Sequence, residues 1–350
     1  MKKLLSITTL VLSLVLISCK STSENSLSCN DPGVGTLAES AFSQNFKSYL
    51  QANYPDLANS EGWGGGVPGC ETASRNPVIF IHGNNDYSQS WQTIRQYFLN
   101  NGYTPAELYA IGWGNKGTGE NLNNFHKAEW IGKIRRFIEA VKNYTGKNVN
   151  IISHSMGVTM TMKAILGGNA YDTYDRSGGA TNLGSPISSY IKVFIGIAGG
   201  VRGVNLCDAT GYGIIYSSSY NCNVNGFKKT GGFITDLISL ANSTKIASKV
   251  FSILSSHDEI ICTKDYKSDY ITPTWGGDDL SQYNPSELLC EVSGIHTSRI
   301  PQEDQTYTYD QNSFISTFTY NLWKSYHLGN HFALRDETGS TQVNIIINNQ

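Results

Sequence analysis

The 350-residue sequence is poor in charge: only 15% of its residues are charged, and the formal net charge is −2. It lacks the excess of basic residues with which nucleic-acid-binding proteins contact phosphates, so a nucleic-acid partner is not expected. It also lacks internal repeats, a Cys-x-x-Cys motif and a His-Glu-x-x-His motif. Its cysteines are too widely spaced for a compact zinc site, so no metal site is predicted.

Long apolar runs are also missing, apart from a short one near the N-terminus. Leu4–Ile17 follows a basic start and is too short to span a bilayer comfortably. This is the pattern of an export signal over residues 1–18, and its end, Leu16-Ile17-Ser18-Cys19, resembles a bacterial lipobox. In a lipobox the signal is cleaved before the cysteine, which is then acylated. We expect an exported lipoprotein, anchored to a bacterial membrane through lipids on Cys19, with a polar tether over residues 19–45.

Seven cysteines are present, and setting Cys19 aside leaves six. An even number in an exported chain predicts disulfide bonds, at most three. Six cysteines can pair in fifteen ways. We expect neighbours along the chain to pair, because each such pair brackets a loop rich in Gly, Asn or Tyr. The expected bonds are Cys29–Cys70, Cys207–Cys222 and Cys262–Cys290.

Along the rest of the chain, apolar runs of strand length alternate with segments of helical spacing. Strands are expected at residues 77–81, 107–113, 149–153, 191–198 and 249–255, and helices at 90–100, 129–144, 158–166, 233–240 and 340–347. This alternation predicts one α/β domain, placed at residues 46–350, with a mainly parallel sheet covered by helices on both faces. Residues 200–248 break the alternation and are expected to be a loop-rich insertion, either a lid or a surface excursion.

Residues 153–157, Ser-His-Ser-Met-Gly, lie between an expected strand and an expected helix. They fit the Gly-x-Ser-x-Gly motif with serine in place of the first glycine. The motif needs small residues two positions before and after the nucleophile, because that serine occupies a strained turn. Ser155 is therefore predicted to be a nucleophile at the carboxyl end of the sheet, the alternative being a solvent-facing serine at a helix start. Its neighbour His154 is expected to pack and not to act as a base.

A second signal, Phe80-Ile81-His82-Gly83-Asn84, ends the first expected strand. Acyl transfer needs two N–H donors at the oxyanion. One is expected from Met156, which follows the nucleophile, and the other from Asn84, where Gly83 lets the backbone approach the substrate. His82 is expected to brace this loop.

An acid is expected just past the strand at 249–255. Asp258 occupies this place, with Glu259 and Asp265 as alternatives. Asp258 is preferred because the order Ser, Asp, His along the chain is that of α/β-hydrolases. The competing interpretation is an aspartate that only caps a turn.

Several motifs, in this order, resemble the class 2 lipase family of the α/β-hydrolase superfamily. They are Asn76–Asn84, Gly102–Tyr109, Ile151–Gly157, Phe194–Gly199, Ser255–Ile261, Thr297–Pro301 and His331–Thr338. The resemblance implies an α/β-hydrolase fold and hydrolysis of carboxylic esters, often lipid esters, without a metal or a cofactor. The family's chain order leaves His296, His327 and His331 as bases. His331 is preferred because it opens the family's C-terminal motif, on an expected loop before the closing helix.

The predicted function is cleavage of an ester or lipid substrate by Ser155, His331 and Asp258 through an acyl-enzyme. Two alternatives stay open. An acyltransferase would use the same three residues and differ only in excluding water. A surface-binding lipoprotein would keep the hydrolase fold with an idle site.

Overall fold

The computed structural model describes residue 29 and residues 41–208, 219–256, 258, 260–262, 290–310 and 330–350. The export signal, Cys19, residues 209–218 of the expected insertion, and the alternative candidates Glu259, Asp265 and His327 lie outside these residues. Within them, no helix has the length and apolar character needed to cross a membrane.

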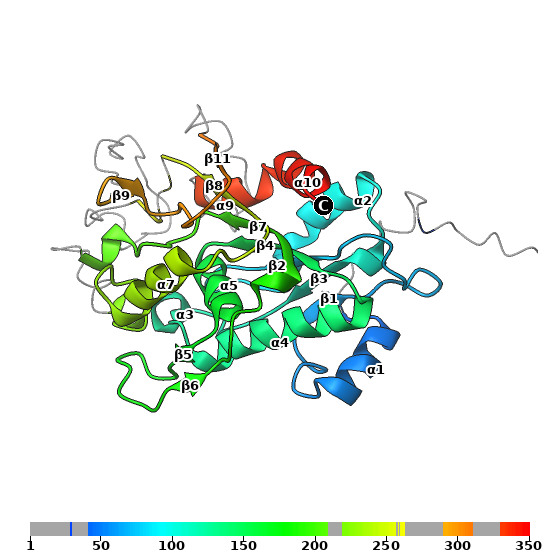
Figure 1. Cartoon of the computed structure of the whole chain (residues 1–350), viewed down its shortest axis with the longest axis horizontal. Helices are drawn as coiled ribbons and strands as arrows, with labels where there is room; N and C mark the ends of the chain where they lie inside the picture. Colours follow the sequence, from blue (N-terminus) through cyan, green and yellow to red (C-terminus); the bar gives the residue numbers. More distant parts are fainter. Residues whose placement is uncertain are drawn as a thin grey trace, which may run out of the picture.

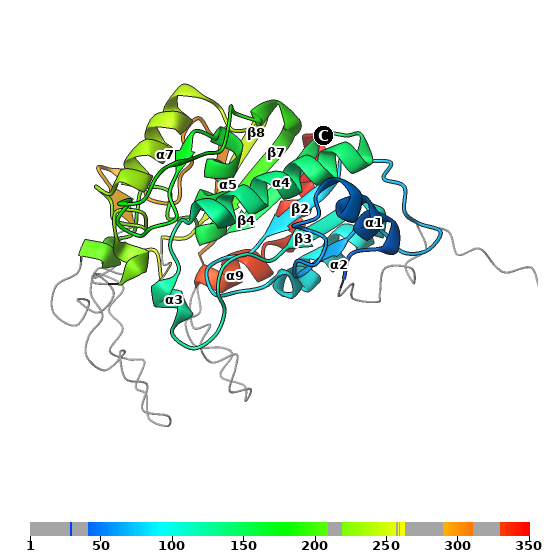
Figure 2. The same ribbon diagram turned by 90° about the horizontal axis from the view of Figure 1, so that it is seen from below.

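A seven-stranded sheet forms the centre of the domain, with helices on both faces (Figure 1, Figure 2). Its order is β1 (Gly62–Gly64), β3 (Leu108–Ile111), β2 (Val78–Ile81), β4 (Val149–His154), β7 (Ile191–Ile197), β8 (Lys249–Leu254) and β11 (Gln305–Thr308). β1 is antiparallel to β3, and every other neighbouring pair in this sheet is parallel. The mainly parallel sheet predicted from the sequence is confirmed.

Two layers of helices cover the sheet. One layer holds α1 (Gln44–Asn53), α4 (Ala128–Thr145), α5 (Met156–Leu166) and α7 (Gly232–Ser243), and the other holds α2 (Gln92–Asn100), α9 (Asn330–Asp336) and α10 (Gly339–Asn348). Alternate residues of a strand point to opposite faces. In β2, Ile79 and Ile81 join the first apolar layer, while Val78 and Phe80 join the second. Burial on both faces explains why this strand is a continuous apolar run.

Shorter elements connect these layers. They are α3 (Glu120–Asn123), the pairs β5 (Asn169–Ala170) with β6 (Thr181–Asn182) and β9 (Glu291–Val292) with β10 (Ile295–His296), and the 3-10 helices η1 (Ser88–Trp91), η2 (Pro105–Glu107), η3 (Ser188–Tyr190), η4 (Asn205–Asp208) and η6 (Tyr220–Cys222).

The folded domain begins before the predicted boundary at residue 46. α1 starts at Gln44, and the Ser43 hydroxyl caps it by accepting the N–H of Phe46 at 3.3 Å. Phe42 is buried and bridges to Gly64 of β1. The last residues of the expected tether at residues 19–45, from Phe42 on, therefore belong to the folded domain.

The segment at residues 200–248 contains a core helix. α7 lies between β7 and β8 and packs against α5, burying Phe233, Ile234, Leu237 and Ala241. Parallel strands need such a crossover connection. The half of the segment that contains α7 therefore belongs to the core of the fold. The expectation of a lid or a surface excursion now concerns only the residues before α7.

The three disulfides of the structure pair as predicted: Cys29–Cys70, Cys207–Cys222 and Cys262–Cys290. The second closes the segment that follows β7, and the third closes the segment that follows β8. Two of the three cross-links therefore lie on connections that leave the carboxyl end of the sheet.

Candidate active site

Ser155 is the single residue between the end of β4 at His154 and the start of α5 at Met156. Its φ of 55° and ψ of −129° form a combination that residues with a side chain rarely adopt. The turn needs a small residue two positions later, because a Cβ on Gly157 would lie 2.2 Å from the carbonyl oxygen of His82. The strand, strained serine and helix expected from the sequence are all present.

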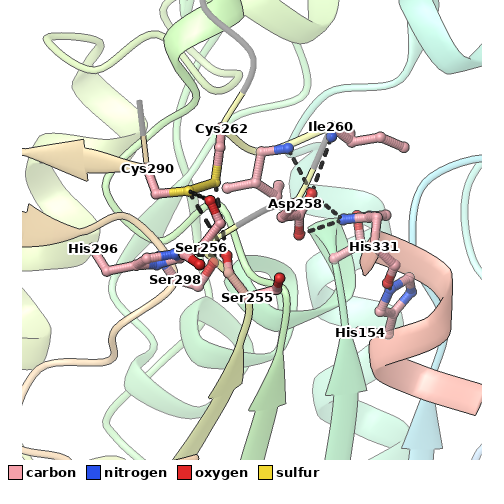
Figure 3. Close-up of polar contacts among 12 residues, drawn as sticks. His154, Ser255, Ser256, Asp258, Ile260, Cys262, Cys290, His296, Ser298 and His331 are labelled. Atoms are coloured by element: carbon pink, nitrogen blue, oxygen red, sulfur yellow. Dashed lines mark hydrogen bonds and ion pairs between the residues drawn. A yellow bond between two sulfur atoms is a disulfide. The ribbon is translucent and has the colours of Figure 1, made fainter. Parts of the chain in front are cut away.

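Three side chains that are distant in sequence meet at this turn. His331 Nε2 lies 3.0 Å from Ser155 Oγ, and His331 Nδ1 lies 3.0 and 2.8 Å from the two carboxylate oxygens of Asp258. The His331 and Asp258 side chains are almost completely buried and face each other (Figure 3). In this geometry Nδ1–H donates to the carboxylate, which leaves Nε2 to accept the proton of the serine.

The turn after β8 sets the direction of the Asp258 carboxylate. Its Oδ1 accepts the N–H groups of Ile260 at 3.0 Å and Ile261 at 2.9 Å. The Asp258 carbonyl accepts the N–H of Cys262 at 2.9 Å, and Cys262 is tied to Cys290 beside the same turn (Figure 3). Asp258 therefore caps the turn and contacts His331 as well, so capping is not its only contact.

The alternative base His296 is turned away from the nucleophile. Its Nδ1 accepts the N–H of Ser298 at 3.1 Å, so its Nε2–H donates to the Ser255 carbonyl, also at 3.1 Å. His296 thus supports the strand end next to Asp258, and of the histidines that the structure describes, it is His331 whose Nε2 lies within hydrogen-bonding distance of Ser155 Oγ.

His331 lies in the first turn of α9 and not on a loop, which corrects the expectation from the sequence. Contacts from the strand before Ser155 and from the loop after β2 help to hold this helix. His154 donates from Nε2 to the His331 carbonyl oxygen at 2.9 Å, and Arg335 forms an ion pair with Asp86 at 2.6 Å. Burial, followed by the nearby His331, lowers the pKa of His154 well below its usual value, so its imidazole is neutral. The packing role expected of His154 thus includes a hydrogen bond to the backbone of His331.

His82 braces the loop after β2, which is the role expected of it. Its ring stacks on Trp113 with 5.2 Å between centroids, its Nε2 accepts the Trp113 N–H at 3.0 Å, and its Nδ1–H donates to the Gly83 carbonyl at 2.7 Å. Burial lowers its pKa to about 4. A Cβ on Gly83 would lie 2.8 Å from the Cβ of Ser155, so this loop passes directly against the candidate nucleophile.

The two expected oxyanion donors both border Ser155. Met156 is the first residue of α5, and N–H groups in the first turn of a helix have no partner within the helix. Asn84 follows Gly83 in the loop against Ser155, and its side-chain Oδ1 accepts a hydrogen bond from Asn124 Nδ2 at 2.8 Å. The arrangement can present two N–H groups to an oxygen that develops charge beside Ser155.

In the described part of the chain, one group of side chains has the spacing of metal ligands. Ligand atoms of Cys262, Cys290 and His296 lie within 4.8 Å of one another. The two sulfurs form a disulfide, and both nitrogens of His296 are engaged in hydrogen bonds. These residues therefore do not fit a metal in the oxidised protein.

The sequence and the structure were compared with those of known proteins. The model of the class 2 lipase family matches residues 75–292, a span that contains Ser155 and Asp258 and ends before His331. Among solved structures, the mature Bacillus licheniformis lipase BlEst2 is similar at 15% identity and a TM-score of 0.36, covering 53% of this chain and 67% of that one. Aspergillus fumigatus lipase B is similar at 14% identity and a TM-score of 0.38, covering 55% of this chain and 40% of that one. Pyrococcus furiosus esterase Pf2001 is similar at 13% identity and a TM-score of 0.33, covering 53% and 63%. Since the family model spans more than half of the sequence, the chain belongs to the class 2 lipase family and is a carboxylic ester hydrolase with an α/β-hydrolase fold.

Proposed function

We propose that the protein cleaves lipid esters through a triad of Ser155, His331 and Asp258 and a covalent acyl-enzyme. One observation carries the proposal. Unbroken hydrogen-bonding contacts of 3.0 Å or less run from Ser155 Oγ through the imidazole of His331 to the carboxylate of Asp258. They start from a serine held in the strained turn that exposes a nucleophile in α/β-hydrolases.

In the first step, Ser155 Oγ attacks the carbonyl carbon of the ester while His331 Nε2 takes its proton. The Asp258 carboxylate accepts the Nδ1–H bond and stabilises the imidazolium that forms. The N–H groups of Met156 and Asn84 donate to the oxyanion of the tetrahedral intermediate. His331 then gives the proton to the departing alcohol oxygen, and the acyl group stays on Ser155.

In the second step, water replaces the alcohol. His331 Nε2 takes a proton from the water, whose oxygen attacks the acyl carbon, and the same N–H groups hold the second oxyanion. Collapse of this intermediate breaks the bond to Ser155 Oγ and returns the proton to the serine. The products are a carboxylic acid and an alcohol.

The test is turnover of p-nitrophenyl esters of short and long acyl chains by the mature protein and three variants. Ser155→Ala and His331→Ala should each lose about 10⁴–10⁶-fold in kcat, because such residues act as a unit. His296→Ala is the matched control and should keep near-normal kcat, since His296 faces the Ser255 carbonyl. An inactive His296→Ala beside an active His331→Ala would reverse the assignment of the base. Transfer of the acyl group to an added alcohol in preference to water would identify an acyltransferase.

We also propose that the exported protein is held at a bacterial membrane through lipids on Cys19. Support comes from the lipobox-like Leu16-Ile17-Ser18-Cys19 and from three disulfides, which are typical of exported proteins. Mass spectrometry of the N-terminal peptide should find Cys19 as the first residue with acyl chains attached. An unmodified Cys19 in the mature chain would contradict the anchor.

A further inference from the structure

Three asparagines connect the loop after β2, which lies against Ser155, with the segment after β7. We call Asn84, Asn124 and Asn221 the asparagine bridge. Asn124 lies in its middle with a fully buried side chain. Its Nδ2 donates to Asn84 Oδ1 at 2.8 Å and to the Asn115 carbonyl at 2.9 Å. Both hydrogens of this amide nitrogen are therefore used, one of them on the residue expected to supply an oxyanion donor.

Asn124 is itself fixed by its surroundings. Its Oδ1 accepts the N–H of Asn115 at 3.3 Å, and its own N–H donates to the Glu120 carbonyl at 3.0 Å. The amide cannot rotate without breaking several hydrogen bonds in a dry environment, where each unmade bond is costly. Asn124 is thus a rigid point to which the loop after β2 is attached.

The bridge continues from Asn124 to Asn221. Asn221 Nδ2 donates to the Asn124 carbonyl at 3.1 Å and lies 3.8 Å from Met156 Sδ. Asn221 belongs to η6, whose next residue, Cys222, is bonded to Cys207. The bridge therefore includes Asn84 and contacts the side chain of Met156, the two residues expected to supply the oxyanion donors, and the segment after β7 supplies its other end.

The backbone of the loop after β2 is not rigid by itself, so an attachment to Asn124 would restrain it. Gly83 gives it a flexible backbone, and Asn85 has a φ of 55°, in the left-handed region that side chains disfavour. An oxyanion donor acts well only when it is held in place before the charge develops. Asn84 lies between the flexible Gly83 and the strained Asn85. The hydrogen bond from Asn124 to its side chain restrains the residue at this point.

We propose that Asn124 is a positioning residue of the reaction, which sets the direction of the Asn84 N–H by binding the Asn84 side chain. The inference rests on the proposed function, since it concerns the oxyanion donors of that mechanism. Asn221 supports Asn124 from the opposite side and is expected to have a smaller effect, because its contact with Met156 is through sulfur.

The experiment is a double-mutant cycle with p-nitrophenyl butyrate as substrate. Asn124→Ala and Asn84→Ala should each lower kcat by about tenfold to a hundredfold, less than the full loss of an oxyanion donor, with little change in KM. Asn84→Ala keeps its backbone N–H and removes the side-chain oxygen that Asn124 binds. Both variants remove the same bond. The kcat of the double variant should therefore be no lower than that of the less active single variant.

The matched control is Asn150→Ala, which removes a buried amide from β4, near the end of that strand opposite to Ser155. Asn150 Nδ2 donates to the Asn76 carbonyl at 3.3 Å, so this variant should lower the melting temperature and leave kcat within about twofold of wild type. Independent, multiplicative losses in the double variant, or an unchanged kcat in folded Asn124→Ala, would overturn the inference. If Asn124→Ala fails to fold, Asn84→Ala decides alone, and an unchanged kcat overturns the inference.

These outcomes are distinct from failure of the proposed function. If Ser155→Ala remained active, the mechanism itself would be wrong, whatever Asn124 does. If Ser155→Ala is inactive and kcat is unaffected by Asn84→Ala and Asn124→Ala, the mechanism stands and only the positioning role of Asn124 is refuted.

Discussion

The Cys262–Cys290 disulfide should contribute to both stability and catalysis, whereas Cys29–Cys70 should contribute to stability alone. Loop-closure entropy sets the first effect. The cross-links span 28 and 41 residues. Their removal should lower the free energy of unfolding by about 3.6 and about 3.9 kcal/mol, nearly the same amount. Two variants of matched stability are therefore available, Cys262→Ala/Cys290→Ala and Cys29→Ala/Cys70→Ala.

Their activities should differ because only one cross-link closes the turn of the acid. The N–H of Cys262 donates to the Asp258 carbonyl, and Cys290 Sγ lies 3.1 Å from the Ser256 carbonyl oxygen. Without this bond the turn is less constrained, and small displacements of reacting groups cost large factors in rate. We expect kcat to fall by about tenfold or more in the Cys262/Cys290 variant and to stay near wild type in the Cys29/Cys70 variant.

The assay pairs urea titration with p-nitrophenyl ester turnover at 25 °C under conditions where both variants are folded. Equal losses of kcat in the two variants would refute the reasoning, because they would show that stability alone governs activity. A Cys262/Cys290 variant with normal kcat and reduced stability would show that the backbone bonds of the Asp258 turn suffice.

Three further predictions follow from other contacts of the site. Arg335→Met should lower the free energy of unfolding by about 3 kcal/mol, because it leaves the largely buried Asp86 without its cation, and a urea titration measures this. His154→Phe keeps a ring beside the base but loses the bond to its carbonyl; kcat should fall by about tenfold and recover in part in His154→Gln, and no recovery would deny that bond a role. Burial holds the pKa of His82 at about 4 and that of His126 at about 3, below the ordinary 6.5. The unfolded chain therefore binds these protons first, so stability is complete above pH 6.5 and should fall by about 2–3 kcal/mol per histidine near pH 4.5; His126→Asn should flatten this slope in chemical denaturation.

The central strands and the nucleophile turn were predictable because their signals are local. β2 is an apolar run buried on both faces, β4 is built around the apolar pair Ile151–Ile152 and β7 around the apolar run Val193–Ile195, and Ser155 lies between a strand and a helix in the sequence itself. The neighbour pairing of cysteines succeeded for a related reason, since each bond closes one excursion of the chain.

The edges of the domain were missed because their sequences are short or polar. β1 has glycine at two of its three positions, β11 is the polar run Gln305–Thr308, and α1 buries only Phe46 and Leu50 among its ten residues. Such elements form because a neighbouring strand or apolar layer is available to them. The asparagine bridge and the Arg335–Asp86 ion pair carry no sequence signal, because they join residues that only the fold brings together.

The long sequence separations within the site bear on how the protein is made. Asp86 and Arg335 are 249 residues apart, and Ser155 and His331 are 176 apart. During synthesis strands β1 to β8, the turn at Ser155 and the loop after β2 all emerge well before α9. In the proposed mechanism, a nascent chain that has already formed most of its central sheet still lacks the base for Ser155. Hydrolytic activity should therefore appear only when α9 docks, which makes ester turnover a measure of the final step of folding.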